Sequence, residues 1–408
     1  MKLLCLSNGH GEDAIAVRIL QQLQRLPNPP QLAALPLVGE GKAYHQLENV
    51  LIAGPVQLMP SGGFIYMDGK QLLRDVQGGL LQLTRIQFQI VRSWAKQGAS
   101  ILAVGDIVPL LFAWLSGADY AFVGTAKSEY YLRDELGPVS RQSWMQRWEG
   151  WSGSVYLPWE RGLMSHSRCK AVFPRDRLTT ETLLKWSIPA FDLGNPMMDD
   201  LQPQITPISD NNETLKITLL PGSRFPEASE NWQRIIQAVT DLVQGFSPRQ
   251  KWVFLAAIAP SLDLNPFDEC LSRLGWQKTP VEEALEVQYS WKNATIILTP
   301  RFNDCLHQGD LAIAMAGTAT EQFVGLGKPA IAIPGKGPQF TPRFVEAQSR
   351  LLGPSLILVE SPGDIPDVVR SLLADQNRLK FIAENGQKRM GQPGASHRIA
   401  QCLIEKLI

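Results

Sequence analysis

The chain has 408 residues, enough for two or three domains that each bury a core of their own. Apolar residues make up 44% and charged residues 19%, which is typical of globular and not of disordered proteins. The 39 basic residues are balanced by 39 acidic ones, whereas proteins that bind nucleic acid through its phosphates usually carry a basic excess. We therefore expect no nucleic-acid partner.

The cysteines and the apolar runs bear on the compartment. The five cysteines are scattered and form no CxxC pair, which argues against a disulfide framework or a cysteine zinc site and favours a reducing compartment. The N-terminal apolar run is too short for a signal peptide, and no run approaches the roughly 18 apolar residues of a membrane span. We expect a cytoplasmic protein that is able to contact a membrane surface.

Short apolar runs alternate with longer helical patterns along the whole chain. The runs are continuous Val, Ile, Leu and Ala segments, as in strands that are buried on both faces of a parallel sheet. They predict strands at 3–6, 32–37, 101–104, 121–123, 171–173, 191–193, 217–220, 253–258, 296–298, 311–315, 330–333 and 356–359. This alternation predicts an α/β fold with doubly wound sheets.

The alternation breaks once, in the polar segment MMDDLQPQITPISDNNETLK at 197–216. We expect an N-terminal Rossmann-like domain at 1–200, a linker at 201–214, a C-terminal Rossmann-like domain at 215–390 and a final helix at 391–408. Two such domains facing each other across a cleft form the GT-B architecture, which many sugar-nucleotide glycosyltransferases share. Architecture alone does not fix the reaction.

The segment SNGHGED at 7–13 lies where the first strand turns into the first helix. Gly9 and Gly11 let the backbone approach a ligand closely. A neutral His10 imidazole is a candidate general base. Glu12 and Asp13 are expected to cap the helix and can also contact an acceptor.

Polar residues also follow two later strands of the same half. Asp106 comes directly after the run ILAVG and is the other candidate base, with a helix N-cap as the alternative interpretation. Thr125, Lys127 and Ser128 follow the next strand, and Lys127 is a candidate partner for an anionic group on the acceptor or the donor. We expect the acceptor to bind in this half.

In the C-terminal half, the strand at 217–220 ends in the turn PGSR. The backbone N–H groups of Gly222 and Ser223 can face an anion there, and the guanidinium of Arg224 has the fork geometry that suits a phosphate. The alternative interpretation is an ordinary turn with an exposed arginine.

The strand at 311–315 runs into the sequence AGTATEQ. Gly317, Thr318 and Ala319 open a helix whose unpaired N–H groups and dipole suit a diphosphate. Glu321 and Gln322 lie one turn further along, within reach of ribose hydroxyls. The alternative is a small-residue helix start that packs closely on a sheet.

These turns, LLPGSR, AGTATEQ and SNGHGED, together with LGNPMMD at 193–199, resemble lipid-A-disaccharide synthase. That resemblance implies a GT-B transferase that joins a UDP-activated sugar to a lipid-bearing sugar. The chain is more loosely similar to the lipid-intermediate N-acetylglucosaminyltransferase of peptidoglycan synthesis and to UDP-N-acetylglucosamine 2-epimerases.

The resemblance also implies roles for single residues. Arg224 and the helix start at 317–319 would hold the diphosphate, and one of Glu321 and Gln322 the ribose. Strict register matches Gln322 to the family's glutamate, and its chemistry favours Glu321. Gln339 matches a glutamine that contacts the donor sugar in the peptidoglycan transferase.

The two base candidates match different families. The disaccharide synthases have an essential aspartate at a similar strand end, which favours Asp106, and the peptidoglycan transferase has a histidine in its first turn, which favours His10. The five histidines are scattered and suggest no metal cluster. We expect no cofactor and a metal-independent transfer in which Arg224 and a helix dipole stabilise the leaving diphosphate.

Two stretches at 60–98 and 141–164 combine Trp, apolar residues and Arg, a composition suited to a membrane surface. They would form the docking face for a lipid acceptor, with core packing or a lid as the alternative. Two other functions stay open: an epimerase that acts on the sugar nucleotide itself, and a non-catalytic relative that binds it.

Overall fold

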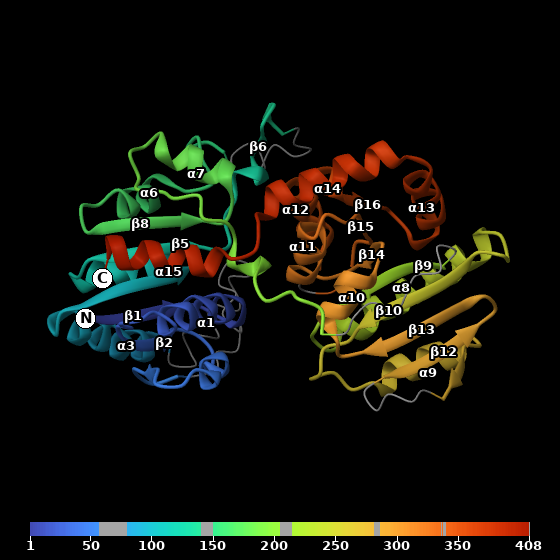
Figure 1. Cartoon of the computed structure of the whole chain (residues 1–408), viewed down its shortest axis with the longest axis horizontal. Helices are drawn as coiled ribbons and strands as arrows, with labels where there is room; N and C mark the ends of the chain where they lie inside the picture. The colour runs from blue at the N-terminus through green and yellow to red at the C-terminus, as the bar shows by residue number, and fades with distance from the viewer. Residues whose placement is uncertain are drawn as a thin grey trace. The chain divides into compact units, whose positions relative to one another are not determined.

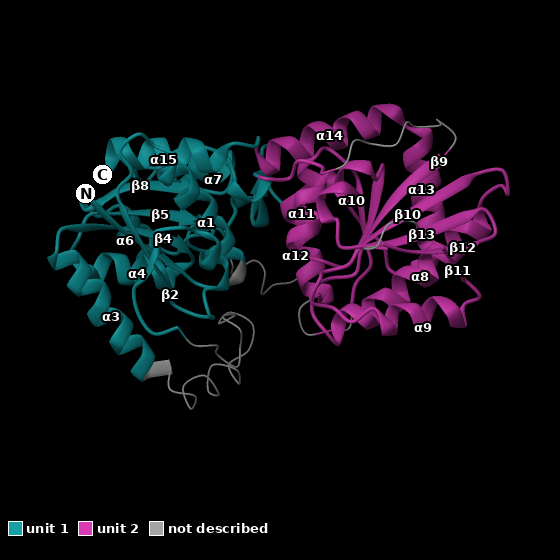
Figure 2. Cartoon of the chain, turned by 60° about the horizontal axis from the view of Figure 1, so that its bottom comes forward, with its two compact units in different colours: residues 1–199, 392–408 teal, residues 200–391 magenta. Residues whose placement is uncertain are grey.

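The computed structural model in Figure 1 describes residues 1–56, 80–139, 150–204, 214–280, 286–335, 337 and 340–407. The chain divides into two compact units, shown in separate colours in Figure 2. Unit 1 comprises Met1–Asp199 and Gln392–Ile408, and unit 2 comprises Asp200–Gly391. The final helix, predicted as a separate segment, is therefore part of unit 1. Most of the predicted linker, at 205–213, lies outside the described residues.

Unit 1 is built on a six-stranded sheet whose strands are all parallel and run in the order β3-β2-β1-β4-β5-β8. The strands are β1 (Lys2–Ser7), β2 (Gln31–Pro36), β3 (Leu51–Ile52), β4 (Ala99–Gly105), β5 (Tyr120–Gly124) and β8 (Cys169–Pro174). A separate antiparallel pair joins β6 (Arg133–Asp134) to β7 (Gly137–Pro138).

Helices cover both faces of this sheet, because successive side chains of a strand point to opposite faces. On β1, Leu3 and Cys5 pack into a core cluster with α1 and α15, whereas Leu4 and Leu6 pack into a second cluster with α3 and α4. The helices are α1 (His10–Gln24), α3 (Leu80–Lys96), α4 (Ile107–Ser116), α6 (Pro158–Met164), α7 (Arg177–Leu184) and α15 (Ala395–Lys406), with 3₁₀ turns η1 (Lys42–Gln46), η2 (Glu129–Tyr131) and η3 (Pro196–Met198).

Unit 2 is built on an eight-stranded sheet in the order β11-β12-β13-β10-β9-β14-β15-β16. Its six strands from β13 to β16 are parallel and repeat the strand order of unit 1, while β12 pairs antiparallel with both of its neighbours. The strands are β9 (Thr214–Leu220), β10 (Lys251–Ala257), β11 (Gln277–Thr279), β12 (Val287–Trp291), β13 (Ala294–Thr299), β14 (Leu311–Ala314), β15 (Ala330–Ala332) and β16 (Leu356–Leu358).

The helices of unit 2 connect these strands. They are α8 (Glu227–Gly245), α9 (Asn265–Arg273), α10 (Phe302–Gln308), α11 (Thr318–Gly325), α12 (Pro342–Leu352), α13 (Ile365–Ala374) and α14 (Gln376–Met390), with 3₁₀ turns η4 (Gly353–Ser355) and η5 (Pro362–Asp364). Among the helices that the structure describes, none is both long and apolar enough to span a membrane.

One predicted strand is wrong. Residues 191–193 form no strand, and their neighbourhood contributes only a single bridge between Val172 and Ala190. Asp192 interrupts the apolar run, and Pro189 and Gly194 flank it, so too few residues remain to form a ladder. The predicted strands also omit β3, β6, β7, β11 and β12. Strands β3, β6 and β7 have two residues each, and β11 reads Gln-Lys-Thr. β12 alternates apolar and polar residues as Val-Gln-Tyr-Ser-Trp, a strand pattern that the prediction missed.

The shared strand order places two equivalent switch points in the molecule. In a doubly wound sheet, ligands bind where the order reverses, outside the carboxyl ends of the two strands that flank the reversal. These strands are β1 and β4 in unit 1 and β9 and β14 in unit 2. SNGHGED and Asp106 follow β1 and β4, and the PGSR turn and AGTATEQ follow β9 and β14. Thr125, Lys127 and Ser128 follow β5, the strand beside β4. LGNPMMD and the two Trp- and Arg-bearing stretches lie elsewhere.

Candidate functional site

At the switch point of unit 2, the strand β9 ends in the PGSR turn. Gly222 has φ +99°, a left-handed conformation that favours glycine, and a Cβ there would lie 3.5 Å from the carbonyl oxygen of Met315. Ser223 and Arg224 are exposed. We call residues 221–224 and 316–319 the anion cradle.

The second part of the anion cradle is the start of α11, whose N-cap is Gly317. The hydroxyl of Thr320 donates to the carbonyl of Ala316 at 2.6 Å, which ties the turn to the first helical residues. The first N–H groups of a helix have no partner within it, and the dipole makes this end positive. Thr318 is exposed and Ala319 half-buried, so solutes reach this helix start.

The other residues predicted to contact the donor lie beside the anion cradle. Glu321 and Gln322 follow in α11 and are both buried. Gln339 lies outside the described residues. The N–H of the next residue, Phe340, donates a hydrogen bond to the carboxylate of Glu227 at 2.6 Å.

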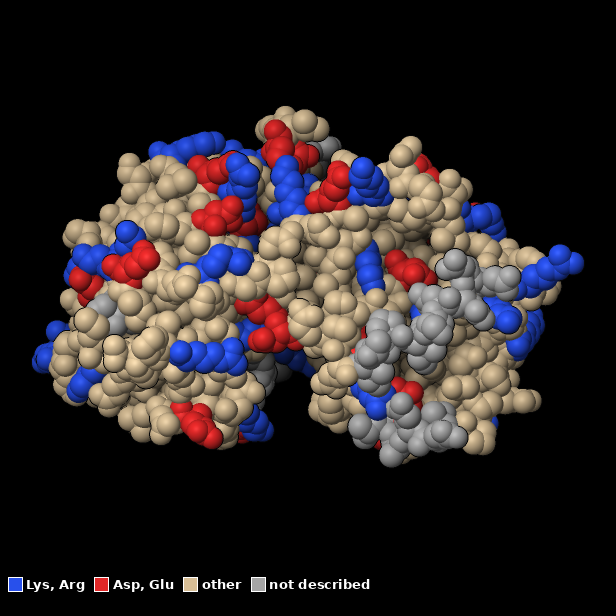
Figure 3. Space-filling model, viewed as in Figure 1, with Lys and Arg blue, Asp and Glu red and all other residues tan. Residues whose placement is uncertain are grey.

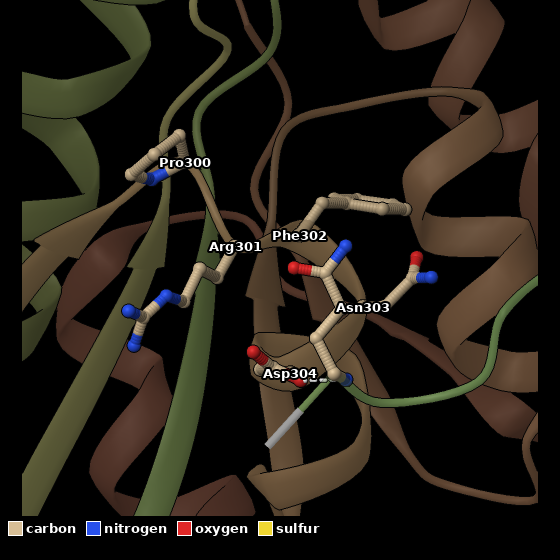
Figure 4. A pocket seen from close by; sticks show the side chains of 6 residues that line it. Pro300, Arg301, Phe302, Asn303 and Asp304 are labelled. Carbon is tan, nitrogen blue, oxygen red and sulfur yellow. Dashed lines mark hydrogen bonds between the residues drawn. The ribbon is translucent and has the colours of Figure 1, made fainter. Parts of the chain in front are cut away.

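A cavity of about 280 Å³ opens at the end of β13, the strand two positions from β9 in the same sheet. Its walls are Gln204, Pro300, Arg301, Phe302, Asn303 and Asp304 (Figure 4). Asp304 accepts a hydrogen bond from the N–H of Gln204 at 2.6 Å, which fixes one wall. Arg301 forms an ion pair with Glu286 at 3.4 Å, and the Phe302 ring supplies an apolar surface. Sequence reasoning did not single out this cavity.

At the switch point of unit 1, β1 turns into α1 through Gly9, whose φ of +130° is a conformation available mainly to glycine. Gly11 is exposed, and a Cβ there would meet no atom within 4 Å. The backbone of His10 begins α1, while the position of its imidazole lies outside the described part of the chain.

Asp106 follows β4 and is the N-cap of α4, where its Oδ1 accepts from the N–H of Val108 at 2.8 Å. Burial raises the pKa of Asp106, and hydrogen bonds from Val108 and the Asn8 side chain oppose that rise, as does the positive charge of Lys127. The cap that the sequence offered as an alternative is thus present. Because the side chain is only half-buried, it keeps a face toward solvent.

Glu12 lies over the same strand end. A Cβ on Gly105 would lie 3.2 Å from its Cγ, and its Oε1 accepts a hydrogen bond from Thr125 at 3.4 Å. Burial raises the pKa of Glu12, and the negative charge of Asp106 raises it further. Two carboxyl groups with raised pKa values therefore lie together at this edge of the sheet.

Lys127 is held by a carboxylate that sequence reasoning missed. Its Nζ lies 2.7 Å and 2.5 Å from the two oxygens of Glu160, a buried residue of α6. Ser128 is fully buried, where its hydroxyl accepts from the N–H of Tyr130 at 3.2 Å and supports the turn from inside.

Asp13 points inward, beneath the first turn. Its carboxylate accepts a hydrogen bond from Ser7 at 2.5 Å, and Ser7 pairs with the Tyr44 hydroxyl at 2.6 Å. Burial raises the pKa of Asp13 to about 6, although the Ser7 hydrogen bond lowers it. Helix α1 has no side-chain hydrogen bond at its N-cap Gly9, so Asp13 stabilises the turn from below and not as the expected cap.

No protein-family model and no curated protein sequence matches this chain. Solved structures do. The UDP-N-acetylglucosamine 2-epimerase of Neisseria meningitidis bound to UDP-N-acetylglucosamine matches with a TM-score of 0.56 at 15% identity, over 100% of both chains. MurG of Acinetobacter baumannii matches with a TM-score of 0.55 at 14% identity, over 99% of both chains. CalG4, the calicheamicin glycosyltransferase, matches with a TM-score of 0.55 at 12% identity, over 99% of this chain and 97% of that one.

The chain has the GT-B fold. The predicted fold class is thereby confirmed. At identities of 12–15%, the likeness establishes the fold and leaves the reaction to the chemistry of the site. On the face of this GT-B protein in Figure 3, side chains of both charge signs are interspersed with uncharged ones.

Proposed function

We propose that the protein is a glycosyltransferase that moves a sugar from a UDP-sugar to a lipid or lipid-linked acceptor. The observation that carries the proposal is the anion cradle, where backbone N–H groups, a helix start and Arg224 meet at a switch point of the sheet. The matched structures support a UDP-sugar as the donor, since one is described as bound to UDP-N-acetylglucosamine and another as a glycosyltransferase.

The donor's diphosphate would lie in the anion cradle. The N–H groups of Gly222 and Ser223 and those at 317–319 supply hydrogen bonds, and Arg224 supplies positive charge. Sugar transfer breaks the bond between the anomeric carbon and the diphosphate oxygen, so negative charge grows on the diphosphate as UDP leaves. Donors and dipoles already aimed at this group stabilise that charge without a metal ion.

The nucleoside would extend from the diphosphate into the cavity at the end of β13. Two strand spacings separate β13 from β9, or roughly 10 Å, which matches the reach from a diphosphate to the far side of a pyrimidine. The Phe302 ring suits a nucleobase face. Glu321 would hold the ribose, with Gln322 as the alternative, and Gln339 would contact the sugar.

Unit 1 would bind the acceptor and supply the base. Asp106 takes the proton from the attacking acceptor hydroxyl, because a carboxylate with a raised pKa accepts a proton more readily at neutral pH. His10 is the other candidate for this step. Gly9, Gly11, Glu12, Asp13, Thr125, Lys127 and Ser128 are the residues proposed to form or support the acceptor side.

The surface of unit 1 supports a lipid or lipid-linked acceptor. Trp151 and Trp159 are 59% and 55% exposed, and Trp159 belongs to α6, which packs against α4 with its exposed Leu111 and Leu115. Arg161 lies 4.0 Å over the ring of the exposed Trp186. Tryptophan and arginine together suit the headgroup level of a bilayer, so we propose peripheral contact with a membrane that holds the acceptor. The parts of the predicted docking face at 60–79 and 141–149 lie outside the described residues.

The test is turnover with a panel of UDP-sugars against lipid extracts, with and without EDTA, and mass detection of the products. The proposal expects a lipid whose mass has grown by one sugar, together with stoichiometric UDP, in the presence of the chelator. A changed free UDP-sugar in reactions without lipid would support the epimerase instead. Donor binding with no product on any acceptor would support a non-catalytic relative.

A further inference from the structure

Two buried amide side chains lie directly behind the anion cradle. Asn231 on α8 and Gln348 on α12 are each 2% exposed. Neither belongs to the turns that sequence reasoning singled out, and neither is exposed to a ligand. Both donate to backbone carbonyls of the anion cradle or of the residue that precedes it.

Asn231 joins the two strand ends. Its Nδ2 donates to the carbonyl of Pro221 at 3.0 Å, after β9, and to that of Met315 at 3.3 Å, after β14. A single amide nitrogen therefore holds two carbonyl groups that belong to neighbouring strands and that would otherwise repel each other. This contact ties the PGSR turn to the helix start.

Gln348 holds the helix start itself. Its Nε2 lies 3.0 Å from the carbonyl oxygen of Gly317 and 3.5 Å from that of Ala316. Both neighbours are acceptors, so the nitrogen and not the oxygen of the amide must face them. Its Oε1 is buried without a hydrogen-bond partner among the described residues, a costly arrangement that favours a specific role for the donor end.

We infer that Asn231 and Gln348 are positioning residues that aim the backbone N–H groups of the anion cradle at its ligand. In a trans peptide, the C=O of one residue and the N–H of the next point in opposite directions. Holding the carbonyls of Pro221 and Gly317 toward the interior thus directs the N–H groups of Gly222 and Thr318 outward. The same argument applies to the N–H of Ala316, which follows the held carbonyl of Met315.

The consequence concerns pre-organisation. A peptide plane that turned over would present a carbonyl oxygen to the phosphate in place of an N–H donor, so each loss of orientation converts attraction into repulsion. The buried amides oppose that turn before any ligand arrives, and at Gly317 they act together with the N–H groups of Thr320 and Glu321, which donate to the same carbonyl. The inference rests on the proposed function only in taking the anion to be the diphosphate of a nucleotide.

The experiment measures the affinities of UDP, inorganic pyrophosphate and uridine by calorimetry for the full chain and its variants. Gln348→Glu and Asn231→Asp keep the shape and remove the donor, and Gln348→Met removes it without adding charge. Each variant is expected to bind UDP and pyrophosphate about tenfold to a hundredfold more weakly, with uridine affinity unchanged. Circular dichroism establishes that each variant is folded.

The matched control is Gln87→Glu in unit 1. Gln87 is also 2% exposed and its Nε2 holds the carbonyl of Leu37 at 3.1 Å, but it lies in the other unit. This variant is expected to bind all three ligands as the wild type does. A loss of UDP affinity that equals that of Gln348→Glu would overturn the inference.

Three further outcomes decide between the inference and the function on which it rests. Folded variants with wild-type affinity for pyrophosphate would overturn the inference, and so would an equal loss of uridine and pyrophosphate affinity, which marks a merely structural role. Wild-type protein that binds pyrophosphate but does not prefer UDP over other nucleoside diphosphates would overturn the proposed donor. In that case, weaker pyrophosphate binding by the variants would still support the positioning role.

Discussion

The carboxyl edges of the two sheets share one strand order and differ in chemistry. In unit 2 the edge presents backbone N–H groups, small residues and Arg224, which together favour an anion. In unit 1 the corresponding edge presents Glu12 and Asp106, carboxyl groups whose pKa values burial raises. Under the proposed function, the same scaffold would supply charge stabilisation in one unit and proton acceptance in the other, the two requirements of transfer from a nucleotide sugar.

The two sheet edges also differ in the groups that hold their functional residues in place. Around the anion cradle, buried neutral amides hold backbone carbonyls. Asp106 likewise accepts hydrogen bonds from neutral groups, the Val108 N–H and the Asn8 side chain, but charged groups also act on it, among them the pair of Lys127 and Glu160. We therefore expect pH to affect mainly the protonation of the unit 1 edge. The number of phosphate groups on a ligand should affect mainly its binding to unit 2.

The largest expected effect comes from Asp106→Asn. The asparagine oxygen can still accept from Val108 and cap α4, so the fold is retained while the proton acceptor is lost. We expect kcat to fall by roughly 10²–10⁴-fold and the Kd for UDP to stay unchanged. Steady-state turnover and calorimetry measure the two quantities.

The control is Asp375→Asn, which changes another aspartate N-cap, that of α14, and should leave kcat unchanged. If Asp106→Asn kept full activity and His10→Ala lost it, His10 and not Asp106 would be the base.

Next in size is Arg224→Ala, which tests the unit 2 side of the comparison. Losing a charged hydrogen bond to phosphate should weaken UDP binding by about 1.5–3 kcal/mol, while uridine binding stays the same. Arg249→Ala is the control, because Arg249 lies before the start of β10, at the opposite end of the same sheet. Unchanged UDP affinity would remove Arg224 from the anion cradle.

Much of the fold could be predicted from the sequence. Strands buried on both faces, such as β1 and β9, read as continuous apolar runs, so eleven of the twelve predicted positions coincide with strands. The exposed edge strand β11 has no apolar run and gave no signal. The strand predicted at 191–193 is wrong, because a short apolar segment by itself does not specify a pairing partner.

The candidate site was predictable only where its residues are neighbours in sequence. Turns such as PGSR join a strand to a helix directly, so the glycine and the arginine are read together. The residues that hold these turns come from distant helices: Gln348 lies 31 residues from Gly317, and Glu160 lies 33 residues from Lys127. The available signal was a polar residue in an otherwise apolar stripe, as Asn231 is among the buried residues of α8.

Asp13 makes the stability of unit 1 depend on pH. Its pKa is raised from 3.8 to about 6 in the folded state, so between these values the folded protein binds more protons than the unfolded one and stability falls as pH rises. From about pH 4.5 to 6.5, this group should lower the free energy of unfolding by roughly 2 kcal/mol. In Asp13→Asn, where the amide oxygen still accepts from Ser7, that part of the decline should vanish.

Hydrogen exchange of peptides from β1 and β2 measures the effect in unit 1, with peptides from β9 as the internal control in unit 2. The assignment fails if wild type and Asp13→Asn lose protection in parallel as pH rises.

The smallest expected effect is a shift of the pH profile by the pair at the unit 1 edge. The positive charge of Lys127 lowers the pKa of Asp106, and the negative charge of Glu160 raises it to a smaller extent. Removing both charges in Lys127→Met/Glu160→Gln should therefore raise the pKa of Asp106 slightly. Because the base acts when deprotonated, the acid limb of kcat should move to higher pH.

The control removes an ion pair of the same type, Lys170 and Asp119, which lie 3.5 Å apart where β8 and β5 begin, at the other end of the same sheet. Lys170→Met/Asp119→Asn should leave the profile in place. An acid limb that moves to lower pH in Lys127→Met/Glu160→Gln would mean that the titrating base does not sense Lys127 as Asp106 does. The proton acceptor would then lie elsewhere in unit 1, with His10 as the next residue to change.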